Sequence, residues 1–483
     1  MVNDPVSLDP TLVEDGGAFK VVANTMQGLV GYDGAGKLQN QLAESAEISR
    51  DGLQYTFVLK AGARWTDGKP VLAQDFVTSI QRALKPGSRS RLAGLLSPIR
   101  GAEEFHAGRS QELGVHADPS DPKKLVIQLG RKATYFLQAL ALPLALPLRA
   151  DILSQNQDQW PETGPSTGFY RLASHRRDQE LVFEKNIWAP ASAPARVIMT
   201  IVQDESTAAS LFDQGKIDVL SRISALDQDR YRKSGLLHTD PLSATYFLSF
   251  NLGKPPFNQR DFRRAVAGAL DRKELTHLLG SGETPARSWI PVGIEGYQPF
   301  EDPRPLFKDA FVKIRGQLQK KPMAPVAAAF DTSSRNSLVM EKIQHDLLQV
   351  LGLRLSLSNQ DWKSYLGVLF TDPAPLYRFG WLAPFLDPAF HLHAFVTGDP
   401  FNLSKWSNPV YDELNRRIEA AEPGPERDEL LRRAQKIVVE DEAIVIPLYH
   451  YVQNTAVSAR VQGFRINPVG VVRFEDLSLR TAP

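Results

Sequence analysis

The stretch that decides the fold is residues 42–82, LAESAEISRDGLQYTFVLKAGARWTDGKPVLAQDFVTSIQR. Its run 55–60 (YTFVLK) is rich in β-branched and aromatic residues, which predicts a strand. Asp67-Gly68 then supplies a turn. In the run 75–84, apolar residues recur on one helical face, at Phe76, Ile80 and Leu84. The stretch therefore predicts a strand, a tight turn and an amphipathic helix in direct succession.

The rest of the chain continues this mixture of strands and helices. Periodicity predicts helices near residues 207–214, 262–270, 337–351, 410–421 and 426–440. It predicts strands at 125–129, 199–202, 353–357, 443–449 and 470–480. Strands interleaved with helices in this way indicate an α/β architecture.

Composition narrows the functional classes. The chain has 483 residues, of which 42% are hydrophobic, as is usual for a globular protein. Lys and Arg number 56 against 55 Asp and Glu, so the formal charge is +1 and no nucleic-acid partner is expected. Cysteine is absent, which excludes disulfides, thiol nucleophiles and cysteine metal sites.

No segment predicts a membrane span or a leader. The longest apolar run, residues 139–148, is interrupted by two prolines and is half the length of a span of about 20 residues. Met1 is followed by VNDPVSLDP, which lacks a basic start and an apolar core. A cytosolic protein and an exported protein without its leader both fit this beginning.

One glycine-rich run has the spacing of a phosphate-binding loop. Residues 31–37 read GYDGAGK, but Leu38 follows where Ser or Thr would hold Mg²⁺. Asp33 would also direct a carboxylate toward the phosphates. A turn between two strands is therefore the favoured interpretation.

Two further patterns suggest chemistry without supporting it. Residues 164–168 (GPSTG) match the nucleophile-elbow pattern around Ser166, but no apolar strand precedes them. His391-Leu-His393 suggests two metal ligands on one face of a strand, but no third ligand lies at useful spacing. We therefore expect no catalytic residue, metal or cofactor, and a protein that is not an enzyme.

The stretch 42–82 resembles the signature of the family 5 extracellular solute-binding proteins, which include the oligopeptide- and dipeptide-binding components of ABC importers. The matching residues are Ala43-Glu44-Ser45, Asp51-Gly52, Tyr55-Thr56-Phe57, Trp65, Asp67-Gly68, Pro70, Ala73, Asp75 and Arg82. Ala46 departs from the pattern, where the family has Trp. Weaker blocks follow in the family's order, among them SLDP at 7–10, Gly380-Trp381 with Asp387-Pro388, and Ile446-Pro447-Leu448-Tyr449.

The resemblance implies an α/β, two-lobed periplasmic-binding-protein fold (class II, large type) with an extra accessory domain. Lobe I would comprise residues 1–31, 152–243 and 443–483. The accessory domain II would be 32–151, and lobe III would be 244–442. We therefore expect the chain to pass between lobes more than once.

The resemblance also implies a ligand site in an interlobe cleft. The Gly-Trp segment would run along the ligand, and a glycine-rich N-terminal segment would form a second wall. The implied ligand-binding residues are Glu14, Asp15, Gly16, Gly17, Trp362, Arg378, Gly380, Trp381, Leu382, Pro384 and Asp387. Arg378 would pair with a ligand carboxylate, and Trp381 would offer a flat apolar wall.

One departure from the family pattern concerns the ligand. Peptide binders of the family carry an Asp three residues after this Trp, and it pairs with the ligand's α-amine, whereas this chain has Pro384. Either another acid reads the amine, with Glu14, Asp15 and Asp387 as candidates, or the ligand has no free amine there. The alternatives are therefore a non-peptide solute such as a sugar, an opine or a chelate and, more remotely, a hydrolase or kinase, or the sensory domain of a regulator.

Partners and location follow from the same resemblance. It implies capture of an oligopeptide or other small solute and delivery to an ABC permease with its ATPase subunits. The protein would be a monomer in the periplasm, or lipid-anchored on the outer face of the cytoplasmic membrane, its leader being absent from this chain.

Overall fold

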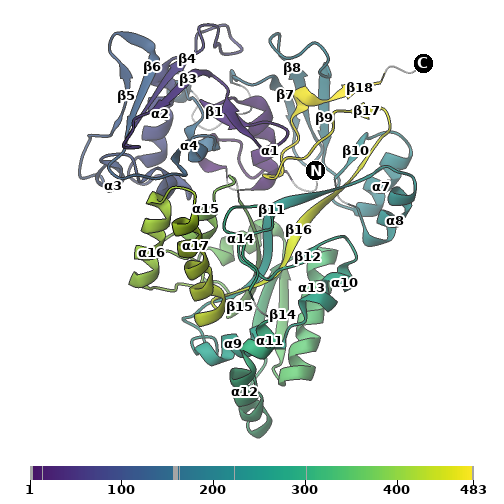
Figure 1. The fold of residues 1–483 in the computed structure, drawn as a ribbon. Coiled ribbons are helices and arrows are strands. Elements are labelled where there is room, and N and C mark those ends of the chain that lie inside the picture. Colours follow the sequence, from purple (N-terminus) through teal and green to yellow (C-terminus); the bar gives the residue numbers. More distant parts are fainter. Residues whose placement is uncertain are drawn as a thin grey trace. The chain divides into compact units, whose positions relative to one another are not determined.

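The computed structural model describes residues 4–13, 15–155, 162, 164–221, 223–300, 302–383 and 385–480 (Figure 1). The chain divides into two compact units: unit 1 comprises Met1–Asp240 and Gln453–Pro483, and unit 2 comprises Pro241–Val452. The chain therefore passes between the two units twice. The finer division into two lobes and an accessory domain stays a prediction. Within the described residues, no helix combines the length and apolarity of a membrane span.

The first half of unit 1 contains the stretch that decided the fold. Strands β3 (Ala43–Ile48), β4 (Gln54–Leu59), β6 (Asp121–Gln128) and β5 (Val115–Asp118) form an antiparallel sheet in that order. Helix α2 (Ala73–Leu84) packs on β5 and β6 through the predicted apolar face, with Phe76 and Ile80 fully buried. Asp75 closes the turn before α2: its carboxylate accepts from Leu72 N (3.0 Å) and Trp65 Nε1 (3.1 Å).

The rest of unit 1 adds smaller elements. The hairpin β1 (Val30–Tyr32) and β2 (Leu38–Asn40) and the three-stranded sheet β7 (Tyr170–Arg176), β8 (Glu180–Lys185) and β9 (Arg196–Thr200) are antiparallel. β10 (Val219–Leu220) pairs with the end of β16 (Val445–Val457), and β17 (Val461–Gln462) pairs with β18 (Ser478–Leu479). The helices are α1 (Gly16–Thr25), α3 (Ala102–His106), α4 (Phe136–Ala139), α5 (Ala150–Gln155), α7 (Glu205–Asp213) and α8 (Ala225–Lys233).

Unit 2 is built on one mixed sheet. Its strands follow the order β16, β11 (Leu237–Phe250), β15 (Leu376–Leu382), β13 (Val326–Asp331) and β14 (Leu355–Gln360), and β12 (Thr284–Pro285) pairs with β16. β11 and β15 are antiparallel, whereas β13 is parallel to both β14 and β15.

Helices flank this sheet on both sides, with α16 and α17 on one side and α10 and α13 on the other (Figure 1). The helices of unit 2 are α9 (Arg260–Ala269), α10 (Arg272–Leu279), α11 (Pro303–Leu306), α12 (Lys308–Lys320), α13 (Ser334–Asp346), α14 (Trp362–Leu369), α15 (Pro388–His393), α16 (Pro409–Ala420) and α17 (Pro425–Lys436). Their apolar faces and the sheet enclose one large core, which includes Leu248, Val266, Val339, Leu376 and Leu448.

Three of the predicted helices and strands need correction. The helix expected over 426–440 ends as α17 at Lys436, and Ile437–Asp441 is a π-helix. The expected continuous α-helix over 337–351 begins earlier, as α13, and its last turn, Leu347–Leu351, is a π-helix that ends at Gly352 with a φ of 81°. The expected strand at 470–480 was wrong, except for β18 at Ser478–Leu479. A turn at Gly470 and a 3-10 turn at Phe474–Asp476 interrupt that run, so its apolar residues are buried one at a time.

Candidate ligand-binding site

The predicted Gly-Trp segment lies on β15, where the strand has a free edge. β15 pairs with β11 along its whole length, from Phe250↔Leu376 to Ala244↔Leu382. Its parallel pairing with β13 covers only Leu376 and Tyr377. Beyond Tyr377 the ladder with β13 has ended, so one edge of residues 378–382 lacks a neighbouring strand among the described residues.

The alternation of hydrogen bonds along β15 shows which backbone groups face that edge. Ala383 N donates to Ser243 O (2.9 Å) and Asn251 N donates to Pro375 O (3.1 Å), so odd-numbered residues of this strand bond to β11. The even-numbered residues direct N–H and C=O the other way. The carbonyl of Arg378 is taken by Tyr365, whose hydroxyl donates at 2.6 Å. The backbone groups left for a partner are therefore those of Gly380 and Leu382.

One face of β15 is packed with aromatic rings. Trp381 is 6% exposed, stacks on Phe390 with centroids 5.0 Å apart, and meets the edge of Phe401 at 5.2 Å. Trp362, the first residue of α14, is half-buried and stacks on Phe379 at 6.2 Å. In this conformation Trp381 is a core residue, and its predicted contact with a ligand stays a prediction.

The opposite face carries buried polar groups. The guanidinium of Arg378 pairs with the carboxylate of Asp331 and lies over the ring of Tyr246, 5.0 Å from its centroid. Burial raises the pKa of the Tyr246 hydroxyl above its ordinary value. A Cβ atom on Gly380 would lie 2.7 Å from the hydroxyl of Tyr451, so glycine is required here by a neighbouring phenol.

The segment after β15 contains the remaining predicted residues of unit 2. Pro384 lies outside the described residues. Asp387 is 4% exposed, and both of its carboxylate oxygens accept from Arg427, at 2.7 and 2.9 Å. The same carboxylate begins α15 by accepting from Ala389 N at 2.8 Å. Asp387 thus has a structural function in unit 2, and its suggested contact with a ligand amine is untested.

In unit 1 the predicted second wall is the start of α1. Asp15 is the N-cap: its Oδ1 accepts from Gly17 N and Ala18 N, both at 2.9 Å, and burial raises the pKa of its carboxyl. Gly16 is exposed and Gly17 half-buried, while Glu14 lies outside the described residues. One oxygen of the Asp15 carboxylate therefore caps its own helix, and Oδ2 accepts a longer bond from Val6 N at 3.4 Å.

The three patterns that suggested chemistry have structural explanations. Within residues 31–37, the stretch 33–37 forms the predicted turn between β1 and β2, where Asp33 Oδ1 accepts from Ala35 N and Lys37 N at 2.8 and 2.9 Å. Ser166 is buried in an irregular segment before β7. Its backbone N donates to the hydroxyl of Thr66, and its carbonyl accepts from Thr66 N, both at 2.9 Å.

The two histidines lie on α15, not on the strand that the sequence suggested, because Asp387 caps a helix there. His391 is fully buried, and burial lowers its pKa to about 3. Burial also acts against the charged form of His393, but hydrogen bonds to Asp399 and Glu419 outweigh it and raise that pKa to about 10. Among the described residues, no three His, Asp or Glu side chains are placed to hold a metal ion.

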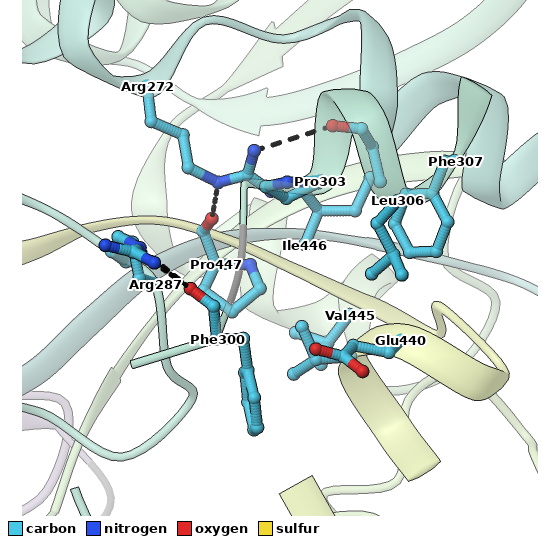
Figure 2. A pocket seen from close by; sticks show the side chains of 13 residues that line it. Arg272, Arg287, Phe300, Pro303, Leu306, Phe307, Glu440, Val445, Ile446 and Pro447 are labelled. Atoms are coloured by element: carbon cyan, nitrogen blue, oxygen red, sulfur yellow. Dashed lines mark hydrogen bonds between the residues drawn. The ribbon is translucent and has the colours of Figure 1, made fainter. Parts of the chain in front are cut away.

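A small pocket of unit 2 lies apart from these residues. Arg272 and Arg287 face it, each bonded to a backbone carbonyl, Arg272 Nε to Pro447 O at 2.7 Å and Arg287 Nε to Phe300 O at 2.8 Å (Figure 2). None of the predicted site residues lines it. We assign it no function, because Arg272 already joins α10 to β16 and Arg287 already joins two segments of the loop between β12 and α11.

The comparison with protein families decides the assignment. Residues 37–402 match the model of the bacterial extracellular solute-binding proteins, family 5 (middle). The chain belongs to this family. The curated relatives include the oligopeptide-binding protein OppA of Bacillus subtilis, 26% identical over 98% of this chain and 90% of that protein. Another is the probable deoxycholate-binding periplasmic protein YgiS of Escherichia coli, 26% identical over 99% of this chain and 92% of that protein.

Solved structures show the same fold over the whole length. The murein tripeptide binding protein MppA of Escherichia coli matches with a TM-score of 0.91 and 25% identity, covering 100% of this chain and 98% of its own. Haemophilus influenzae OppA in complex with RPPGFSPFR matches with a TM-score of 0.91 and 25% identity, over 99% and 98%. The predicted family and the periplasmic-binding-protein fold are thereby confirmed.

Several residues of the candidate site were missed by the sequence. Tyr451 and Tyr246 follow the alternation of their strands, and nothing in the pattern marks them as neighbours of Gly380 and Arg378. Arg427 is one of several arginines in a charged helix. What distinguishes Arg427 is that it is buried. Its carboxylate partners come from loops far away in the chain, so the periodicity of the helix does not reveal this burial.

Proposed function

We propose that this protein is the solute-binding component of an ABC importer and that it captures an oligopeptide or peptide-like ligand. The free edge of β15 carries the proposal. Gly380 and Leu382 direct backbone groups outward, and an extended peptide can pair with them as an added strand, with an affinity that is independent of its side chains. Its curated relatives named for oligopeptide and dipeptide binding support the same conclusion.

The proposed ligand contacts are the residues that the family resemblance implies, taken for each unit by itself. On unit 2 they are Trp362, Arg378, Gly380, Trp381, Leu382 and Pro384, with Asp387 supporting the segment from behind. On unit 1 they are Glu14, Asp15, Gly16 and Gly17. No catalytic step is needed, because a binding protein works by the difference in ligand affinity between its conformations.

The partners are a membrane permease and its ATPase subunits, and the place of action is outside the cytoplasmic membrane. Relatives named as periplasmic proteins support this location. We propose that the protein acts as a monomer.

The backbone-pairing mode is tested by calorimetry with N-methylated peptides. A strand bonds to one neighbour through every second residue. In a series of peptides that each carry one N-methyl group, moved one residue at a time, binding should therefore be weakened and spared alternately. Each lost backbone bond should weaken binding about tenfold. If every methylated position binds as well as the parent peptide, the ligand does not pair with β15.

A second candidate is a ligand without a free α-amine. Pro384 favours it, because proline offers neither a charge nor an N–H at the position where peptide binders of the family have an acid. Comparing a peptide with its N-acetylated form distinguishes the two candidates, since only a site that reads the amine should lose affinity on acetylation. Mass spectrometry of the small molecule that co-purifies with the protein identifies a non-peptide solute directly.

A further inference from the structure

A buried guanidinium joins three separate segments of unit 2. Arg427, near the start of α17, is 1% exposed. Its Nη2 donates to both oxygens of Asp387 (2.7 and 2.9 Å), its Nη1 to Glu295 Oε2 (2.7 Å), and its Nε to Ile418 O (3.3 Å). Only the planar fork of arginine can serve two carboxylates and a carbonyl in this arrangement.

The first of these contacts reaches the candidate site through α15. Asp387 begins that helix by accepting from Ala389 N, and the next residue, Phe390, stacks on Trp381 at 5.0 Å with a ring angle of 25°. Trp381 lies between Gly380 and Leu382, the two residues with outward-directed backbone groups. A displacement of Asp387 would therefore be passed to the free edge of β15 through one helical turn and one ring contact.

The second contact holds a loop that packs against the same ring cluster. Glu295 lies in this loop, and Gln435, two turns beyond Arg427 on α17, donates from Nε2 to Gly296 O (2.9 Å) and accepts from Ile290 N (3.1 Å). Trp289, directly before Ile290, donates from Nε1 to His391 O on α15 at 2.5 Å. The loop and α15 are thus tied to α17 and to each other.

We propose that Arg427 is a positioning residue for ligand binding: it fixes the segment after β15, and with it the free edge, without touching the ligand. This inference rests on the proposed function. In this arrangement Asp387, which the sequence suggested as a contact for the ligand's amine, already has a buried charged partner in Arg427.

The test compares Arg427→Lys with Arg263→Lys. Lysine keeps the positive charge at each position, but it cannot reproduce the fork. Arg263 is a matched control on α9: it is 2% exposed, donates to Phe257 O and Glu442 O at 2.9 Å, and pairs with the Glu442 carboxylate at 3.2 Å. Among the described residues, the hydrogen bonds and the ion pair of its side chain reach neither α15 nor the 289–296 loop.

Two readouts separate positioning from general stability. In the ligand-free protein, hydrogen exchange at the amides of 389–392 should rise at least about tenfold in Arg427→Lys and stay at the wild-type rate in Arg263→Lys. Peptide affinity should fall at least about tenfold in the first variant only. If Arg427→Lys does not fold, Asp387→Asn serves instead, because Asn still caps α15 while the charge pair is lost.

The outcomes discriminate clearly. Unchanged exchange and affinity in Arg427→Lys would overturn the inference, and so would equal changes in both lysine variants, since these would indicate a general loss of stability. If the wild-type protein binds no peptide at all, the proposed function fails. The exchange measurement would then still decide whether Arg427 fixes the segment after β15.

Discussion

Replacing Gly380 by alanine should destabilise unit 2, because Tyr451 occupies the space that a side chain would need. The added Cβ would lie 2.7 Å from the Tyr451 hydroxyl oxygen and 3.3 and 3.4 Å from two ring carbons. Overpacking of this kind typically costs about 1–3 kcal/mol. Tyr451 is half-buried among other rings, with Tyr246 and Tyr449 at centroid distances of 5.9 and 5.4 Å, so it cannot move away freely.

The assay is urea denaturation of the ligand-free protein, with Tyr451→Phe and the double variant alongside. Without the hydroxyl, the nearest atom to the new Cβ is a ring carbon at 3.3 Å, so the double variant should recover most of the loss. Gly316→Ala is the control, because it adds a Cβ to α12 where nothing lies within 4 Å, and it should gain up to about 1 kcal/mol. If the effects of Gly380→Ala and Tyr451→Phe simply add, the steric explanation is wrong.

Two further predictions concern stability. The pKa values of His391 and His450 are lowered by burial to about 3 and about 4, so the folded state favours their neutral forms. Their contribution is present above pH 6.5 and decreases as the pH falls, by about 2 kcal/mol each at pH 5. His393, with its pKa raised to about 10, contributes below pH 6.5 and loses that contribution as the pH rises toward 10. Denaturation midpoints between pH 4.5 and 9.5 should therefore pass through a maximum, and His450→Gln should flatten the acid side; an unchanged acid slope would contradict the assignment. Separately, Asp75→Ala should lower the free energy of unfolding by about 2 kcal/mol, because Leu72 N and Trp65 Nε1 lose their acceptor. Asp309→Ala, at an exposed position in α12, should lower it by less than about 0.5 kcal/mol. Equal losses of stability in thermal unfolding would contradict this prediction.

Much of the fold could be predicted because many helices and strands are determined by local sequence patterns. The apolar face of α2, the strand at 54–59 and the glycine that ends the helix before β14 all follow from rules that act within one or two turns of chain. The run 470–480 failed because its valines and phenylalanine are buried singly, by contacts far away in the chain. No alternation over a few residues can report such contacts.

In the candidate site, too, some features could be predicted from the sequence and others only from the structure. The ordered motifs identified Gly380-Trp381 as a segment along the ligand, but its place on a strand was not predicted. The free edge followed only from the register, since the ladder with β13 stops at Tyr377. The histidine pair was misplaced on a strand because the sequence did not show that Asp387 is a helix cap. The partner of Asp387 is Arg427, 40 residues further along the chain, so a pattern of neighbouring residues could not reveal it.

The structure also limits what β15 can recognise. The side chain of Trp381 is used in the aromatic core, that of Arg378 pairs with Asp331, and Gly380 has none because Tyr451 fills its place. What this strand can offer a ligand is therefore mainly its backbone, which pairs with any extended peptide regardless of sequence. Selectivity among ligands must then come from residues outside β15. This is why the absence of an acid at Pro384, in the segment directly after the strand, bears more on the identity of the ligand than any residue of the strand itself.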